Sequence, residues 1–268
     1  GTHHRNPNIL FCVTILLLLL IPAQQAGAQY FGKNKVNYET FDFQIYKTPH
    51  FQIYHYLEDQ DKLENFAQLA ERWYERHQAI LLDTFRRPSP LILYNDHADF
   101  QQTTVISSLI GVGTGGVTEG LRNRVVMPVK KSNAETNHVL GHEMVHVFQY
   151  HMFKNIDTIN FEAIGSIPLW MIEGLAEYMS IGTRDPHTAM WMRDAIINDD
   201  IPTLKDMTRR PDLYFPYRYG HAFWSFVAAN WGDRMIKPLL LGSGMAGYRR
   251  AVDSLLGFSP DTLSMLWK

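Results

Sequence analysis

Residues 132–151 decide the fold: they read SNAETNHVLGHEMVHVFQYH, with the pentapeptide HEMVH at 142–146. The stretch opens with serine followed three residues later by glutamate, a capping-box spacing that predicts the start of a helix. Residues four apart lie on one face of a helix, so His142 and His146 project from the same side and can bind one Zn²⁺. Glu143 points far enough round the helix to reach a metal-bound water without ligating the metal. The pentapeptide therefore predicts two zinc ligands and a general base.

A second segment supplies the carboxylates that such a site needs. Residues 170–178 (WMIEGLAEY) carry Glu173 and Glu177 four residues apart on a predicted helix from 169 to 180. A catalytic zinc site requires a third protein ligand. One of the two carboxylates can bind the metal, while the other accepts the N–H of a ligating histidine and fixes its orientation. The alternatives are a buried helix with two hydrogen-bonded histidines and a solvent-facing pair of acids, and the two motifs together favour the metal site.

The rest of the chain predicts an α+β protein. Alternating or short apolar segments indicate strands, and apolar residues with a helical period indicate helices. Strands early in the chain and helices later favour a small sheet lobe packed on a helical lobe. The predicted strands are 50–57, 91–94 and 124–129; the predicted helices are 61–85, 97–107, 132–151, 169–180, 188–198 and 219–231, with further helices toward the C-terminus; and the glycine-rich stretch 111–120 is predicted to be a loop.

Composition limits the classes of partner. The chain has 268 residues, 46% of them hydrophobic, which is enough for one large domain or two packed lobes. Its formal net charge of -2 gives no electrostatic reason to expect nucleic acid as a partner.

The N-terminal segment has the pattern of a signal peptide. Residues 9–21 form a run that is apolar apart from Thr14, and Ala26-Gly27-Ala28 supplies the small residues that a signal peptidase recognises. The run is shorter than the roughly 20 residues that span a bilayer as a helix. We therefore expect residues 1–28 to be removed near Ala28 and the protein to be exported to the periplasm or cell envelope, or secreted. The mature chain would then contain residues 29–152 as the sheet-containing lobe with the active-site helix, and 153–268 as a helical lobe. The chain ends within a predicted helix, so we expect that lobe to be truncated.

The two motifs together resemble the gluzincins, zinc peptidases with a zincin-like fold. Residues 170–178 are similar to the segment of aminopeptidase N-like enzymes that carries their glutamate ligand. This resemblance implies one Zn²⁺ per chain between the lobes, held by His142, His146 and Glu173, with Glu177 supporting a histidine ligand. The 26 residues between His146 and Glu173 are more than in the best-known families, which implies a longer connecting loop.

Two further segments extend the resemblance to the aminopeptidases. Residues 217–220 (YRYG) resemble their Tyr-x-Lys-Gly, whose tyrosine stabilises the oxyanion of the tetrahedral intermediate, which implies that role for Tyr217. Residues 116–120 (GVTEG) are loosely similar to their Gly-x-Met-Glu-Asn strand, although methionine and asparagine are absent here. That similarity implies substrate contacts for Gly116 and Glu119, with Glu119 holding a free amine if the enzyme is an aminopeptidase.

The chain from residue 29 onward resembles the peptidase-MA-like N-terminal module of large bacterial envelope proteins that continue into a TolB-like β-propeller. Residues 30–35 (YFGKNK) and 215–220 (FPYRYG) carry this likeness. It implies a β-propeller domain after Lys268 in a longer protein.

The sequence thus predicts a zinc metallopeptidase acting on a peptide or protein substrate. In the predicted mechanism Zn²⁺ polarises water and the scissile carbonyl, Glu143 is the general base, and Tyr217 stabilises the oxyanion. Two alternatives remain at this point: an inactive, zinc-stabilised binding module of a larger envelope protein, and a metallohydrolase acting on a non-peptide bond.

Overall fold

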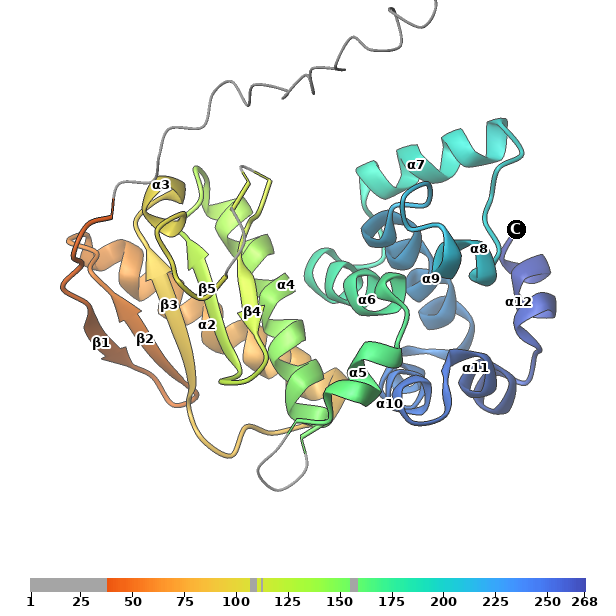
Figure 1. The fold of residues 1–268 in the computed structure, drawn as a ribbon, viewed down its shortest axis with the longest axis horizontal. Coiled ribbons are helices and arrows are strands. Elements are labelled where there is room, and N and C mark those ends of the chain that lie inside the picture. Colours follow the sequence, from red (N-terminus) through yellow and green to blue (C-terminus); the bar gives the residue numbers. More distant parts are fainter. Residues whose placement is uncertain (1–37, 107–109, 112, 155–158) are drawn as a thin grey trace, which may run out of the picture. The chain divides into compact units, whose positions relative to one another are not determined.

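The first half of the chain builds a five-stranded mixed sheet (Figure 1). The computed structural model describes residues 38–106, 110–111, 113–154 and 159–268. The strand order is β1-β2-β3-β5-β4, with β2, β3 and β5 parallel and the two edge strands antiparallel to their neighbours. The strands are β1 (Gln44–Lys47), β2 (Phe51–His55), β3 (Ser89–Tyr94), β4 (Val117–Glu119) and β5 (Arg124–Pro128).

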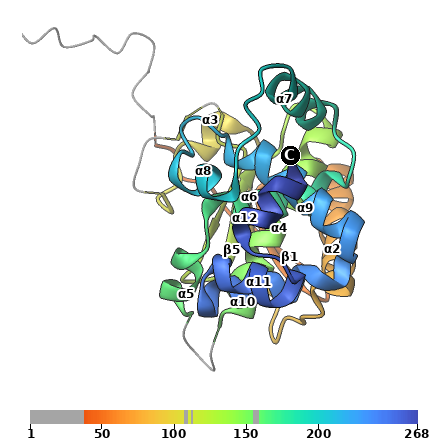
Figure 2. The same cartoon turned by 90° about the vertical axis from the view of Figure 1, so that its right-hand side faces the viewer.

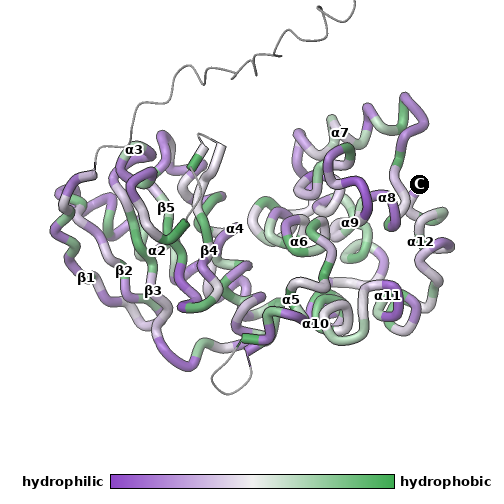
Figure 3. The backbone as a smooth tube through the Cα atoms, in the orientation of Figure 1, coloured by the Kyte–Doolittle hydropathy of each residue, from purple (hydrophilic) through white to green (hydrophobic). Residues whose placement is uncertain are grey.

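Alternation along the strands gives the sheet two buried faces. One face packs against the helices α2 (Gln60–Leu81) and α4 (Asn133–Met152) and belongs to the main core. The other face forms a smaller cluster with Phe100 of the short helix α3 (His97–Phe100). Hydrophobic residues accordingly follow the central strands (Figure 3). The main-core face carries Phe51, Ile53, Leu91, Leu93, Val125 and Met127, and the other carries Ile92, Tyr94 and Val126.

Helix α4 lies between the sheet and the helical part of the chain, and α2 supports it from behind (Figure 1). The Trp73 indole of α2 donates a hydrogen bond to the backbone oxygen of Asn137, 3.0 Å away. The same ring lies over Gly141, where an added Cβ would come within 2.6 Å of it. His77 of α2, fully buried, contacts the backbone oxygen of Gly141 at 2.9 Å. Close packing across α2 and α4 thus fixes the turn that precedes the HEMVH segment.

The second half of the chain is helical, and α6 and α9 form its closest pair. Gly174 of α6 faces Gly220 of α9 so closely that a Cβ on Gly174 would lie 2.2 Å from the backbone carbon of Gly220. The last helix lies beside the C-terminus, and the two helices before it lie at the bottom of Figure 2, on the side that faces the viewer. The helical elements are α5 (Phe161–Ser166), α6 (Leu169–Ile181), α7 (Pro186–Ile197), α8 (Leu204–Arg209), α9 (Pro216–Trp231), the 3₁₀ turn η1 (Asp233–Met235), α10 (Ile236–Ala246), α11 (Tyr248–Leu256) and α12 (Pro260–Trp267).

The predicted α+β class, a small sheet lobe with a helical lobe, is confirmed. Two local predictions are wrong. The helix expected over 97–107 ends at Phe100, since Thr103, Thr104 and Val105 are β-branched and disfavour a helix. The glycine-rich stretch expected to be a loop contains β4, which pairs with β5.

Contacts join residues 38–268 into one unit. The predicted boundary between 152 and 153 stays a prediction, and the predicted signal peptide at 1–28 lies outside the described residues. Within the described part of the chain, helices that combine the length and the hydropathy needed to cross a membrane are absent.

Candidate metal centre

Three donor atoms from α4 and α6 converge at the predicted site. The Nε2 atoms of His142 and His146 lie 3.2 Å apart, and each lies 3.3 Å from Oε2 of Glu173. Ligand atoms placed about 2.0–2.1 Å from a tetrahedral Zn²⁺ are separated by about 3.3 Å. The three atoms therefore have the spacing of three corners of a tetrahedron. Two imidazole nitrogens and one carboxylate oxygen are also a donor set that catalytic zinc uses, so these residues fit the metal.

A second group, His138, His142 and Glu177, also lies close enough to bind a metal. Here Oε1 of Glu177 lies 2.9 Å from Nδ1 of His142 and 3.1 Å from Nε2 of His138, which are hydrogen-bond distances. The other carboxylate oxygen already faces a cation, because Arg218 Nη1 is 3.1 Å from it. This arrangement suits Glu177 better as the hydrogen-bond partner of the two imidazoles than as a ligand.

The charges of the cluster favour a cation at this position. Burial lowers the pKa of His142, but the carboxylates of Glu173 and Glu177 outweigh that effect and raise its pKa to about 10. The pKa of His146 is raised in the same way, against its burial, mainly by Glu173. Burial acts to raise the pKa of Glu173 and of Glu177, yet the neighbouring histidines hold both well below the usual range. The same negative charges would stabilise a bound metal cation, and metal binding would compete with protons for the imidazole nitrogens.

His146 has its own supporting residue, Gln149. Nδ1 of His146 lies 2.7 Å from Oε1 of Gln149. The amide of Gln149 donates a hydrogen bond to the backbone oxygen of Ile172 at 3.1 Å. Gln149 is buried, and this pair of contacts ties α4 to α6 directly beside Glu173. Each predicted histidine ligand therefore has one ring nitrogen held by a neighbouring side chain, which fixes the direction of the other.

Glu143 lines a cavity of about 230 Å³, and His142, His146 and Glu173 line the same cavity. Oε2 of Glu143 is 2.7 Å from the hydroxyl of Thr118 on β4, and that hydroxyl is also 3.0 Å from the backbone oxygen of Glu143. A single hydroxyl proton can be donated to either acceptor. Thr118 therefore orients the carboxylate and ties α4 to the edge strand. A larger hollow, of about 750 Å³, lies at the far end of α4 around residues 83–90, and the donor atoms are not part of its lining.

Tyr217 reaches the same cavity from the first turn of α9. Its ring stacks on that of His142, with centroids 5.7 Å apart and planes inclined by 13°. Burial and the nearby carboxylate of Glu173 raise the pKa of the phenol, so it stays protonated at neutral pH. Gly220 follows Tyr217 by three residues in α9. Its close approach to Gly174 of α6 brings the start of α9 near the candidate metal ligands.

Of the two predicted substrate-contact residues, Gly116 and Glu119, one lies at the cavity and the other does not. Gly116 lines the cavity, and a Cβ there would lie 3.1 Å from Cγ of Glu143. Glu119 is not part of the lining. Its Oε2 pairs with Nε of Arg124 at 3.0 Å, across the β4–β5 register in which the two residues are partners.

Three residues that are not among the predicted site residues complete the cluster: Thr118, Gln149 and Arg218. Gln149 follows His146 by three residues, so helical spacing was a signal for its role. Thr118 and Arg218 lie within the segments 116–120 and 217–220, but only tertiary packing brings them to the cluster, so spacing within one element does not predict their contacts.

Residues 106–200 match the model of the BSP family, described as "Peptidase of plants and bacteria". The match supports a peptidase-like family. It spans both helices that carry the donor atoms, α4 and α6, together with β4, and it ends before Tyr217. Comparison with curated proteins finds no match for the chain.

Proposed function

We propose that this chain is a zinc metallopeptidase of the gluzincin type, with His142, His146 and Glu173 holding one Zn²⁺. The observation that carries the proposal is the spacing of the three donor atoms, 3.2–3.3 Å, inside a segment that matches a peptidase family. Glu177 and Gln149 support it, because each holds one ring nitrogen of a histidine ligand.

Glu143 is the general base in this proposal. Bound zinc would supply Lewis-acid activation of water and of the scissile carbonyl. The Glu143 carboxylate, oriented by the Thr118 hydroxyl, takes a proton from the attacking water and later delivers it to the leaving amine. Tyr217, which remains protonated, donates a hydrogen bond to the oxygen on which negative charge develops.

The proposed substrate is a peptide or protein segment that enters the cavity between β4 and the start of α9. The net charge of -2 gives no reason to add nucleic acid as a partner. We also propose export and removal of the N-terminal segment near Ala28, on the pattern of residues 9–28.

Zinc analysis and a peptide-library digest of the wild-type chain and of Glu143→Gln test the proposal. We expect about one zinc per chain in both proteins. Hydrolysis in the variant should fall by at least ~10²-fold, because glutamine keeps the size of the side chain but cannot accept the proton. Glu162→Gln, the same change at an exposed position of α5, is the matched control.

The outcomes separate the alternatives. Turnover in Glu143→Gln equal to that of the wild type would remove Glu143 from the mechanism. A chain that binds zinc but cuts no peptide would instead be a zinc-stabilised binding module or would act on a non-peptide bond. A chain without zinc affinity would contradict the proposal itself.

A further inference from the structure

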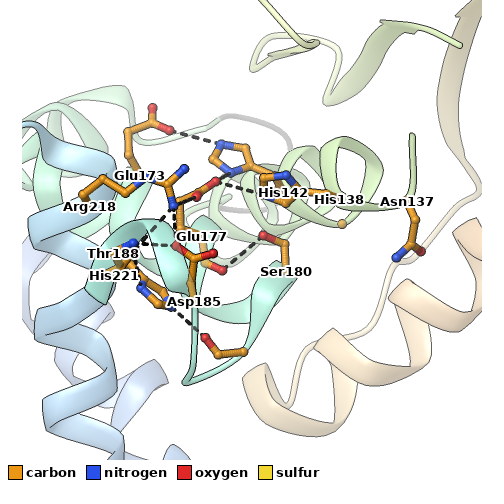
Figure 4. Close-up of polar contacts among 12 residues, drawn as sticks. Asn137, His138, His142, Glu173, Glu177, Ser180, Asp185, Thr188, Arg218 and His221 are labelled. Carbon is orange, nitrogen blue, oxygen red and sulfur yellow. Dashed lines mark hydrogen bonds and ion pairs between the residues drawn. The ribbon is translucent and has the colours of Figure 1, made fainter. Parts of the chain in front are cut away.

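Arg218 is a mostly buried cation that bridges two carboxylates behind the metal centre (Figure 4). Its side chain is 18% exposed. Its Nη1 lies 3.1 Å from Oε2 of Glu177 and 3.1 Å from Oδ2 of Asp185. Arg218 belongs to the first turn of α9 and Glu177 to α6, while Asp185 is the N-cap of α7. One guanidinium thus joins the starts of two helices to the carboxylate that contacts His142.

Among the described residues, the ion-pair partner of the second carboxylate oxygen of Glu177 is Arg218. Glu177 is 3% exposed, and its Oε1 contacts the imidazoles of His142 and His138. Its Oε2 accepts no hydrogen bond within the part of the chain that the structure describes. The contact with Arg218 is close enough for an ion pair but is not a well-directed hydrogen bond. A buried carboxylate is costly unless it is paired, so the ion pair of Oε2 with Arg218 adds to the contacts of Oε1 with His138 and His142 in stabilising Glu177.

On the side away from Glu177, Arg218 contacts Asp185, which belongs to a hydrogen-bond network around the start of α7. Asp185 accepts a hydrogen bond from the backbone N–H of Thr188 at 2.7 Å, which caps α7. The hydroxyl of Thr188 lies 2.9 Å from Nδ1 of His221, whose Nε2 lies 2.6 Å from the backbone oxygen of Gly182. Both ring nitrogens of the buried His221 are therefore engaged away from the cavity. Asp185, one of the two carboxylates that contact Arg218, is therefore itself held by the cap of α7.

We propose that Arg218 is a positioning residue that holds the Glu177 carboxylate against Nδ1 of His142 and thereby aims Nε2 of His142 at the metal. The inference deepens the proposed function and rests on it. Arg218 follows Tyr217 directly, so one turn of α9 places the tyrosine in the cavity and the cation behind it. If Arg218 only ties α7 to α9, its replacement should leave the His142 ring N–H signal and the zinc affinity unchanged.

The test uses the full chain and two measurements. The first is zinc affinity, by competition with a chelator. The second is the nuclear magnetic resonance signal of the His142 ring N–H in the metal-free protein, which reports the contact with Glu177. In Arg218→Met we expect zinc affinity to fall by about 10- to 100-fold, as for other residues that orient a metal-ligating histidine, and the ring signal to be lost by exchange with water. Arg218→Lys, which keeps the charge, should recover part of both.

A double-mutant cycle separates positioning from a general structural role. Once Glu177→Gln has removed the carboxylate charge, adding Arg218→Met should lower zinc affinity by less than 3-fold further. Two equal and additive losses would mean that Arg218 does not act through Glu177. Arg210→Met is the matched control, since Arg210 forms an exposed ion pair with Asp212, and it should leave both measurements unchanged.

Failure of the inference and failure of the proposed function look different. Wild-type zinc affinity and an unchanged His142 ring signal in Arg218→Met would overturn the inference and leave the proposed function standing. If the wild-type chain binds no zinc, the proposed function fails. The ring signal of the metal-free protein then decides alone whether Arg218 holds Glu177 and His142 together.

Discussion

At the residue scale, Tyr217 places a protonated phenol in the cavity that the three candidate metal ligands line. Its ring rests on His142, and its raised pKa comes from burial and from the charge of Glu173. A preorganised donor in a site with little water stabilises a developing oxyanion more strongly than the same donor would in bulk water. In the proposed mechanism, loss of the Tyr217 hydroxyl would therefore lower the rate of reaction and leave zinc binding unchanged.

Replacing Tyr217 by phenylalanine tests whether the hydroxyl affects the rate without affecting zinc binding. We expect kcat to fall by about 10²- to 10³-fold, the usual effect of removing one oxyanion donor, while zinc content stays the same. Steady-state kinetics and metal analysis on the same preparation give both numbers. Tyr214→Phe is the control, because its hydroxyl contacts Asp200 away from the cavity. Loss of zinc in Tyr217→Phe would place the hydroxyl among the residues that hold the metal.

The position of Glu119 bears on whether the proposed enzyme is an aminopeptidase or an endopeptidase. An aminopeptidase needs a carboxylate that is available to the free amine of its substrate. The carboxylate of Glu119 pairs with Arg124 and does not line the cavity. We therefore expect N-acetylated peptides to be cut as well as free ones, and Glu119→Ala to change the ratio of the two rates by less than ~3-fold. A strong preference for free N-termini that disappears in Glu119→Ala would restore the aminopeptidase role.

At the element scale, the crossing of α6 and α9 decides where Tyr217 and Arg218 lie. A Cβ on Gly220 would be 2.0 Å from the backbone oxygen of Trp170, a distance that real structures do not contain. Only glycine allows the two backbones to approach so closely. The glycines after Glu173 and after Tyr219 therefore serve helix packing, and through it the geometry of the cavity.

Gly220→Ala should push the two helices apart. We expect a loss of about 1–3 kcal/mol in the free energy of unfolding, the usual cost of overpacking, together with a fall in kcat as Tyr217 moves away. Urea unfolding of the metal-free protein and kinetics of the zinc-loaded protein measure the two effects. Gly165→Ala is the matched control, because Gly165 lies in α5 with no neighbour near its Cβ position, and it should be neutral or stabilising. Equal stability of Gly220→Ala and Gly165→Ala would contradict the packing argument.

At the scale of the whole molecule, the proposed zinc joins the sheet-supported helix α4 to the helical part of the chain through α6. Only the folded chain brings His142, His146 and Glu173 within 3.3 Å of one another, because they come from two helices. A ligand that binds only the folded state raises the free energy of unfolding, by about 2.7 kcal/mol at a concentration 100 times its Kd.

Zinc should therefore raise the Tm of the chelator-treated protein. His146→Ala should lose most of the zinc-dependent shift, because it removes a ligand, whereas His187→Ala, at an exposed position of α7, should keep it. Thermal unfolding followed by circular dichroism, with and without zinc, measures the shift. An equal shift in His146→Ala and in the wild type would mean that zinc stabilises the protein at another place.

Local periodicity is where sequence and structure agree. The helix from the Ser132 capping box, the second helix with its two glutamates and the central strands follow from residue spacing and turn chemistry, and each lies close to its predicted position. The α+β class follows from their order. The short strands β1 and β4 and the short helices α5 and α8 were not anticipated, because few residues carry too little periodic signal.

The sequence by itself determined which residue types share a helix face: two imidazoles and a carboxylate on α4, and two carboxylates on α6. Spacing of three or four residues is a property of a single helix, so it can be recognised without a fold. Only the tertiary structure decided that Thr118 faces Glu143, that Glu119 pairs with Arg124, and that Arg218 lies behind Glu177. Those contacts join separate elements, and their distances depend on how the helices and the sheet pack, above all on the close approach of α6 and α9 at their two glycines.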